Sequence, residues 1–323
     1  MMKKITNRIL PLLLCLWLLV QSVSAAELLV PGGQVIGLQL ADQTVTVTAF
    51  DGQLGQTAQA AGLQIGDRIV SIDDNAVRSA QDIRKALDRS DGEVDVSILR
   101  SGKAKKLHLQ PAITEDGPRL GVYLKQGVTG IGTVTWYDAQ TGEFGALGHG
   151  VSTPDGGLVD MESGSAFSAA VMSVRKGLAG EPGQLMGTLT NKEPVGALSK
   201  NTAQGVFGKM PEAPAVQPLP VGERCDVRTG PAMIRSTVAD TQVQEYSVEI
   251  LKIYPHSGAT GRNMLIKVTD ERLLNTTGGI VQGMSGSPII QDGKLIGAVT
   301  HVLVNDPTMG YGIFIENMLD AAA

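Results

Sequence analysis

The residues of this chain that can do chemistry include one serine in a glycine-rich turn. The stretch GMSGSP at residues 283–288 carries Ser285 with glycines two positions before it and one after it. Glycine lets a backbone turn sharply enough to expose a hydroxyl and to aim two N–H groups at one point, where they stabilise the charge that develops during acyl transfer. The motif therefore predicts Ser285 as a nucleophile, with the Gly283 and Ser285 amides as an oxyanion hole. The alternative is a surface turn, which Gly, Ser and Pro build for reasons unrelated to chemistry.

A serine hydroxyl needs a neighbouring base, and the chain has four histidines. His149 lies in GALGHGV with a glycine on each side, which leaves room for a substrate to approach the imidazole. His108 is expected on an exposed strand and His256 in a turn. We therefore predict His149 as the base, although a glycine-flanked histidine can also be a simple turn residue.

The run LIGAVTHV, which follows the serine motif, reads as a strand that ends near Thr300 and His301. A strand directly after the nucleophile is placed to border the substrate. We expect Thr300 and His301 to line the substrate pocket, and His301 to act there rather than as the base.

The group that orients the base is less sharply defined. Asp270 closes the strand-like run MLIKVTD, fifteen residues before Ser285. Strand ends suit catalytic groups because the sheet fixes the backbone while the side chain reaches a cleft. Asp270 can equally be the cap of a helix that begins at Glu271, and position along the chain does not decide. Three aspartates near the histidine region are alternatives: Asp138, Asp155 and Asp160.

A second module precedes these residues. The segment AGLQIGDRIVSIDDNAV at residues 61–77 reads as a helix end, a turn and a strand over Arg68–Ile72. Ser79 then caps an amphipathic helix. The order of these elements and the sequence of this segment resemble a PDZ domain, with predicted limits of 27–112.

PDZ domains bind an extended peptide by adding it to the edge of a sheet. The strand and loop that match this role begin near Gly32, so Ile36, Gly37 and Leu38 are predicted to bind the peptide. The ligand is expected to be a peptide, and a segment of the same chain is one candidate. The alternative is a PDZ fold that only packs against its neighbour.

Composition narrows the class of protein. The 323 residues carry a net charge of −5 and include 40 glycines and 15 prolines. Few aromatic residues and short alternating runs favour a mainly β chain, and the acidic balance argues against nucleic acid as a partner. Cys15 and Cys225 lie far apart and no histidine pair has ligand spacing, so neither a metal nor a cofactor is expected.

The first 26 residues read as a targeting element. Lys3, Lys4 and Arg8 precede the apolar stretch Ile9–Val20, and small residues follow. This layout predicts a signal peptide, or a membrane anchor if it is not cleaved. The working domains are then expected outside the cytoplasm.

Taken together, the targeting segment, the PDZ-like module, GALGHGV, KVTD and the long stretch from GIVQGMSGSP to FIENML resemble the stage IV sporulation protein B serine peptidase family. The resemblance implies a chymotrypsin-like β-barrel peptidase domain over 113–323. It also implies a triad of His149, Asp270 and Ser285.

The same resemblance carries biological expectations. A member of this family is expected in the space between the forespore and mother-cell membranes. It would cleave itself and then a regulatory membrane protein, which starts the intramembrane activation of a late sporulation sigma factor. Its protein substrate would thus be met at a membrane surface.

Two features depart from the broader chymotrypsin pattern. Met284 stands where an acidic residue commonly precedes the nucleophile, so activation by a new N-terminus that pairs with this carboxylate is not expected. The PDZ-like module also comes first. The alternative function is a secreted, non-catalytic PDZ protein with a degenerate peptidase domain, which a fluorophosphonate would not label at Ser285.

Overall fold

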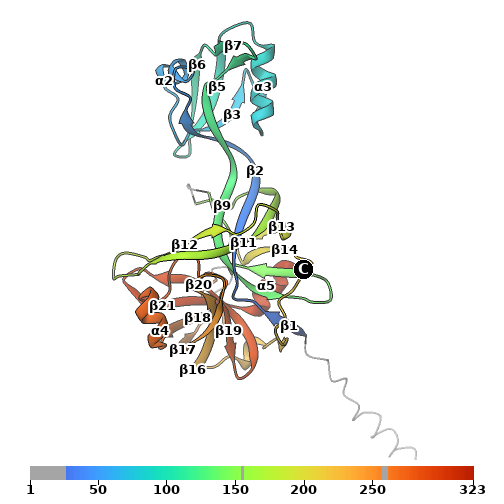
Figure 1. The fold of residues 1–323 in the computed structure, drawn as a ribbon, viewed down its shortest axis with the longest axis vertical. Helices are drawn as coiled ribbons and strands as arrows, with labels where there is room; N and C mark the ends of the chain where they lie inside the picture. The colour runs from blue at the N-terminus through green and yellow to red at the C-terminus, as the bar shows by residue number, and fades with distance from the viewer. Residues whose placement is uncertain (1–26, 154–155, 257–260) are drawn as a thin grey trace, which may run out of the picture.

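The computed structural model describes residues 27–153, 156–256 and 261–323. A small module and a larger β-rich body are joined by two long strands (Figure 1). The predicted targeting segment, residues 1–26, and the candidate Asp155 lie outside the described residues. Within the described ranges, no helix has both the length and the apolar character needed to cross a bilayer.

Six strands form the first barrel of the body. The ring closes because β2 pairs with β11 on one side and with β9 on the other, so that Gly37 lies opposite both Phe167 and Ile131. Alternation along these strands buries one set of apolar side chains, including Ile36, Leu38 and Phe144. The ring runs β2 (Val35–Phe50), β9 (Val122–Tyr137), β10 (Glu143–Ala146), β14 (Gly205–Lys209), β13 (Gly196–Thr202) and β11 (Met161–Arg175). The short strands β1 (Leu28–Pro31), β12 (Gln184–Leu189) and β15 (Leu219–Pro220) extend it.

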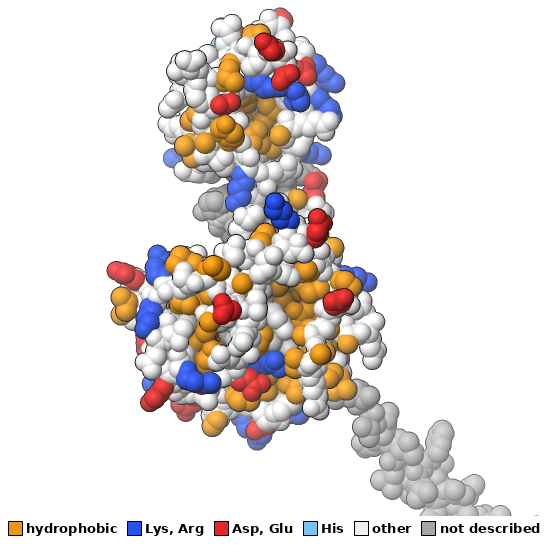
Figure 2. Space-filling model, viewed as in Figure 1, with side chains coloured by type: hydrophobic (Ala, Val, Ile, Leu, Met, Phe, Trp, Pro, Cys, Tyr) orange, Lys and Arg blue, Asp and Glu red, His pale blue; other side chains and the backbone are white. Residues whose placement is uncertain are grey.

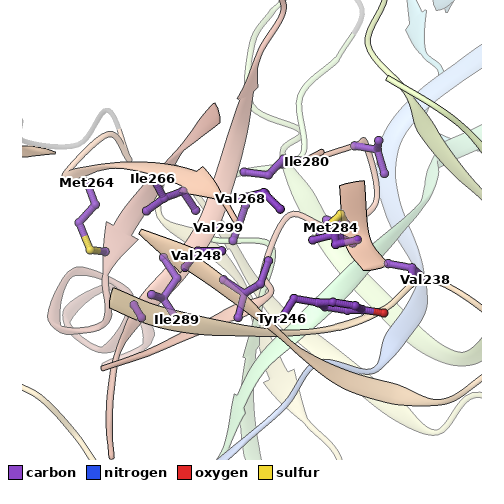
Figure 3. Close-up of a cluster of buried hydrophobic side chains, with 14 of the residues drawn as sticks. Val238, Tyr246, Val248, Met264, Ile266, Val268, Ile280, Met284, Ile289 and Val299 are labelled. Carbon is purple, nitrogen blue, oxygen red and sulfur yellow. The ribbon is translucent and has the colours of Figure 1, made fainter. Parts of the chain in front are cut away.

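A second closed barrel follows in the chain. Its strand order is β16 (Gly230–Thr237), β17 (Val243–Ile253), β18 (Met264–Val268), β21 (Asp306–Phe314), β20 (Lys294–Leu303) and β19 (Pro288–Gln291). Three short helices accompany it: η1 (Arg224–Asp226), α4 (Glu271–Thr277) and α5 (Ile315–Ala322). Its core is aliphatic apart from Tyr246 and Phe314, and Met284 from the serine motif lies within it (Figure 3). The presence of two barrels, one after the other, confirms the predicted chymotrypsin-like architecture.

The small module has the predicted PDZ fold. Strand β3 covers Arg68–Ile72 as expected, and Ser79 caps α3 by accepting a hydrogen bond from the Asp82 amide. Inside the module, the buried carboxylate of Asp67 pairs with the Arg100 guanidinium at 2.7 Å. The remaining elements are α2 (Gln56–Ala60), β4 (Asn75–Ala76), α3 (Ala80–Arg89), β5 (Val94–Arg100), β6 (Lys103–Leu109), β7 (Ala112–Thr114) and β8 (Gly117–Arg119).

The module is inserted into the first barrel, a feature that differs from the predicted limits of 27–112. Strands β2 and β9 each run for 16 residues and pair along their lengths, so that both cross from the body into the module (Figure 1). Residues 28–40 therefore belong to the peptidase body, and residues 122–126 still belong to the PDZ sheet. The strand pattern of β2 and of β9 continues without a break where each passes from the body into the module. The sequence of either strand therefore gives no sign of the boundary between the two domains.

The prediction that Ile36, Gly37 and Leu38 bind a PDZ ligand is wrong in this fold. Both edges of β2 at these positions are already paired, with β11 and with β9. Ile36 and Leu38 are buried in the core of the first barrel. No free sheet edge remains there for a peptide to join.

Candidate active site

His149 and Ser285 line one cavity of about 680 Å³ between the two barrels. The first barrel supplies the histidine from the loop after β10, and the second supplies the serine from the turn before β19. Gly283, Thr300 and His301 line the same cavity. Five of the residues singled out in the sequence therefore meet at one place, although 136 positions separate the histidine from the serine.

Glycine backbone conformation and the burial of Met284 fix the shape of the turn that carries Ser285. Gly283 and Gly286 have φ angles of +100° and +96°, which side chains with a Cβ rarely adopt. A Cβ on Gly286 would also collide with the carbonyl oxygen of Thr133. Met284 is fully buried beside Tyr246 and Val238 (Figure 3). Burial of the apolar Met284 side chain thus anchors the turn at the position where the chymotrypsin pattern commonly has an acidic residue.

The two proposed oxyanion donors are free to bind a substrate oxygen. Among the described residues, the amide N–H groups of Gly283 and Ser285 donate to no other group, whereas the neighbouring Met284 amide donates to the Val281 carbonyl. Free backbone donors are uncommon in folded proteins and are usually reserved for water or a ligand. The pair therefore has the chemistry of an oxyanion hole.

The Ser285 hydroxyl is held by the neighbouring strand. It donates a hydrogen bond of 2.8 Å to the carbonyl oxygen of Thr300. The Thr300 side chain itself is buried and donates to the Gly261 carbonyl. Thr300 therefore faces the cavity through its backbone, and the serine must turn its hydroxyl from this carbonyl to reach a base.

The His149 imidazole is prepared to act as that base. Its Nδ1 lies 2.9 Å from the carbonyl oxygen of Gly150, which can only accept a hydrogen bond. Nδ1 must therefore carry the proton in the neutral ring, and Nε2 keeps a lone pair. Burial lowers the pKa of His149 below its ordinary 6.5, because the charged form loses hydration, although the Gly150 hydrogen bond opposes this effect. The ring is neutral at neutral pH.

His301 is the direct neighbour of this ring. The two ring centroids are 5.2 Å apart and the planes are tilted by 38°. Burial, followed by the charges of His149 and Arg262, lowers the pKa of His301 to about 4. Its Nδ1 is buried and has no hydrogen-bond partner among the described residues. His301 is thus a neutral ring in the cavity wall, with one buried nitrogen that no described residue satisfies.

Asp270 is placed elsewhere. Its carboxylate caps α4, where it accepts hydrogen bonds from the amides of Arg272 and Leu273. It also pairs with the Arg272 guanidinium at 2.8 Å, and this bond above all lowers the pKa of Asp270 to about 2. Asp270 does not line the cavity, and the His149 Nδ1 is satisfied by Gly150. The capping interpretation describes its contacts, and the triad role does not.

Two substitutions separate these roles. Asp270→Asn should keep labelling by a fluorophosphonate within a few-fold of wild type, because asparagine is also a good N-cap. Asp270→Ala should lower the free energy of unfolding by about 1 kcal/mol through loss of the cap. An orienting acid behaves differently, since its replacement by asparagine costs about 10⁴-fold in kcat through the wrong tautomer. Labelling rates and thermal melts of both variants decide, and a 10⁴-fold loss in the asparagine variant would restore the triad role.

No other described aspartate takes the place beside His149. Asp138 lies in the turn after β9, where the Thr141 hydroxyl donates to it at 2.6 Å. Asp160 is exposed and lies outside the cavity lining. The described residues that line the cavity include no carboxylate. The backbone carbonyl of Gly150 is the acceptor that orients the base.

A second groove lies on the PDZ module, with a volume of about 460 Å³. One wall is α3, which contributes Ile83, Arg84 and Leu87, and the other begins at Arg119 and continues into β9. Residues 122–126 of β9 pair with β2 on one edge, and the described residues supply no strand on the other edge. Figure 2 shows hydrophobic side chains on this module with basic side chains beside them. The groove therefore joins a free strand edge to walls that carry apolar side chains, two arginines (Arg84 and Arg119) and two aspartates (Asp51 and Asp116).

Comparison with protein families decides the identity of the chain. A family model described as SpoIVB peptidase S55 matches residues 116–319, more than half of the chain. The chain belongs to the SpoIVB peptidase family. It is thus a serine peptidase, and a PDZ-domain model matches residues 51–100 of it.

The individual relatives match only a part of this chain. A putative zinc metalloprotease of Rhizobium meliloti is 34% identical over 100 residues, which are 31% of this chain and 26% of the relative. One of Staphylococcus aureus is 40% identical over 81 residues, 25% of this chain and 19% of the relative. The chain thus spans about a quarter or less of these relatives.

Solved structures that match part of the chain include an inactive form of the Rv3671c protease of M. tuberculosis, with 13% identity and a TM-score of 0.36 over 60% of this chain and 84% of that one. The HtrA-type protease AlgW, solved with a decapeptide, has 14% identity and a TM-score of 0.36 over 65% of this chain and 57% of that one. A PDZ domain of an SdrC-like protein from Listeria monocytogenes has 25% identity and a TM-score of 0.22 over 25% of this chain and 85% of that one.

Sequence reasoning missed three functional groups that the structure provides. The Gly150 carbonyl has no sequence signal, because any residue supplies one. The PDZ groove begins at RLGV, residues 119–122, where a glycine precedes an alternating strand, and these residues lie beyond the predicted module limit of 112. Thr133 contacts the nucleophile turn from a strand 152 positions before Ser285, which no local pattern indicates.

Proposed function

We propose that this serine peptidase is an endopeptidase that works outside the cytoplasm, with Ser285 as nucleophile and His149 as base. The observation that carries the proposal is the cavity that contains both side chains together with two unpaired amide donors. Its 680 Å³ can hold several residues of an extended peptide. The free edge of β20 beyond Val299, which carries Thr300 and His301, lies where that peptide can join the sheet.

The chemistry follows from the tautomer. His149 Nε2 accepts the Ser285 proton as the oxygen attacks the scissile carbonyl carbon, and a C–O bond forms. The resulting oxyanion is held by the Gly283 and Ser285 amides. The imidazolium then gives its proton to the leaving amine as the C–N bond breaks, and water repeats the sequence on the acyl-enzyme. The Gly150 carbonyl keeps Nδ1 protonated throughout.

Labelling with a fluorophosphonate tests the proposal. The probe should form a covalent adduct on the intact chain, and peptide mapping by mass spectrometry should place the adduct on Ser285. Absence of an adduct under conditions that label a reference serine peptidase would leave the alternative, a non-catalytic PDZ protein that binds peptides.

For the PDZ module we propose that the groove between α3 and β9 binds a peptide with a free C-terminal carboxylate. The amides of Leu120 and Gly121 donate to no described group, and Arg84 and Arg119 line the same groove together with Asp51 and Asp116, the second of which lies 3.9 Å from Arg119. Unpaired amides next to cationic side chains form a site for an anion. A segment of the same chain remains a candidate ligand.

Charge reversal in this groove provides the measurement. Arg119→Glu should weaken binding of fluorescein-labelled hexapeptides with an apolar, free C-terminus by about tenfold, as expected for a charge-assisted hydrogen bond. Amidated versions of the same peptides should bind weakly to both proteins. Lys103→Glu, on a strand away from the groove, is the matched control. Equal affinity of free and amidated peptides for the wild type would refute carboxylate recognition.

The biological setting is proposed on family membership alone. The chain would be secreted or membrane-anchored between the forespore and mother-cell membranes. There it would cleave itself and a regulatory membrane protein, which triggers intramembrane activation of a late sporulation sigma factor. Expression of the chain in a sporulating host that lacks its own enzyme, followed by a sigma-factor reporter, tests this role. A silent reporter despite an active peptidase would contradict it.

A further inference from the structure

We infer that Thr133 is a positioning residue that sets the shape of the oxyanion hole, an assignment that rests on the proposed function of Ser285. Thr133 lies on β9 of the first barrel and is fully buried. It touches neither the base nor the nucleophile oxygen in the contacts observed. Its influence passes through the backbone of the turn that carries Ser285.

Thr133 makes two hydrogen bonds across the interface of the barrels and one within the first barrel. Its hydroxyl donates to the Gly283 carbonyl at 2.8 Å, and its amide donates to the Ser285 carbonyl at 3.0 Å. Its own carbonyl accepts from the Leu147 amide at 3.2 Å, two positions before His149. One residue thus contacts both the nucleophile turn and the loop of the base.

These bonds determine which way the peptide groups of the turn face. The carbonyls of Gly283 and Ser285 point to β9 and are satisfied there. The Ser285 amide lies between these two fixed carbonyls, and it has no partner among the described residues. The Gly283 and Ser285 carbonyls of the turn are therefore bonded to Thr133, while the Gly283 and Ser285 amides remain available to a substrate.

The hydrogen bond from the Thr133 hydroxyl to the Gly283 carbonyl matters because a glycine backbone has little intrinsic preference for one conformation. Gly283 has a φ of +100° and no Cβ, so little within the residue opposes rotation of the adjoining peptide groups. Thr133→Val keeps the size and shape of the side chain but leaves the Gly283 carbonyl without its donor, which favours rotation towards another one. Such a rotation turns the 283–284 peptide group, which lies between the Gly283 and Ser285 amides and sets their relative direction towards the developing oxyanion.

The test compares three variants by fluorophosphonate labelling of the full chain. Thr133→Val should lower the maximal labelling rate by about 100-fold, within the range for a misplaced oxyanion donor, with a smaller change in the half-saturating probe concentration. Thr133→Ser restores the hydroxyl and should recover the rate to within about fivefold of wild type. Thr237→Val is the structural control, because Thr237 is equally buried and donates to the Gly33 carbonyl at 2.9 Å.

The outcomes are distinguishable. If the wild type is not labelled, the proposed function fails before Thr133 is tested. If the wild type is labelled and Thr133→Val reacts at the same rate, the positioning role is refuted while the peptidase stands. A loss shared equally by Thr237→Val, or a loss that Thr133→Ser does not recover, assigns the effect to general destabilisation and also overturns the inference.

Discussion

Ser285→Ala should lower kcat by about 10⁶-fold, the loss seen when a serine peptidase loses its nucleophile. No fluorophosphonate adduct should form, since the attacking oxygen is gone. The fold should remain, because the substitution removes one hydrogen bond, to the Thr300 carbonyl, which is worth about 1 kcal/mol. Labelling kinetics and a thermal melt on the same preparation measure both effects.

The motif supplies its own control in the second serine. Ser287 is fully buried and donates to the Ser236 hydroxyl at 3.0 Å, away from the cavity. Ser287→Ala should therefore reduce stability by about 1 kcal/mol and keep its labelling. The reverse pattern, with labelling lost in Ser287→Ala and kept in Ser285→Ala, would move the nucleophile to the second serine.

His149→Ala should cause a loss of similar size, because Ser285 then has no group to take its proton. Residues that act as one unit are not additive. The double variant of His149 and Ser285 should thus be no slower than either single variant. A double variant slower by the product of the two losses would mean that the two side chains act independently.

The pH dependence of labelling follows from the same imidazole. His149 acts as a base only when neutral, and burial lowers its pKa from 6.5. Activity should therefore persist as the pH falls below 6.5 and then decline when the ring becomes protonated. The labelling rate measured as a function of pH gives the inflection, and an inflection above 6.5 would contradict the buried, neutral ring.

Local structure was largely predictable from the sequence. The strand over Arg68–Ile72 and the Ser79 cap have short-range signals, a turn on each side and a serine before an amphipathic run. The nucleophile turn was equally visible, because its glycines mark positions whose φ values, +100° at 283 and +96° at 286, other residues rarely adopt. The choice of His149 depended on elimination among four histidines, and its place in the cavity with Ser285 agrees with that choice.

Long-range placement was not predictable in the same way. Asp270 closes a strand and also begins a helix, and only the tertiary structure shows that its carboxylate is used by the helix. The peptide-binding role in the PDZ module was assigned to Ile36, Gly37 and Leu38 because a loop and strand of the matching pattern begin near Gly32. In the fold, the free edge belongs to the strand that leaves the module, at Val122. Which of two strands lies at an edge depends on pairing, and pairing has no signature within one strand.

The paired crossing of β2 and β9 has a practical consequence for dissecting the molecule. A shortened chain that starts at residue 113 would lack β1 and β2. The first barrel would then lose one of its six strands, the one whose pairing with β9 and β11 closes the ring. Excision of the interior from about residue 44 to 126, bridged by a tight hairpin, would instead rejoin the halves of the ladder. By the same geometry, one protease nick within the module would leave both fragments attached to the body.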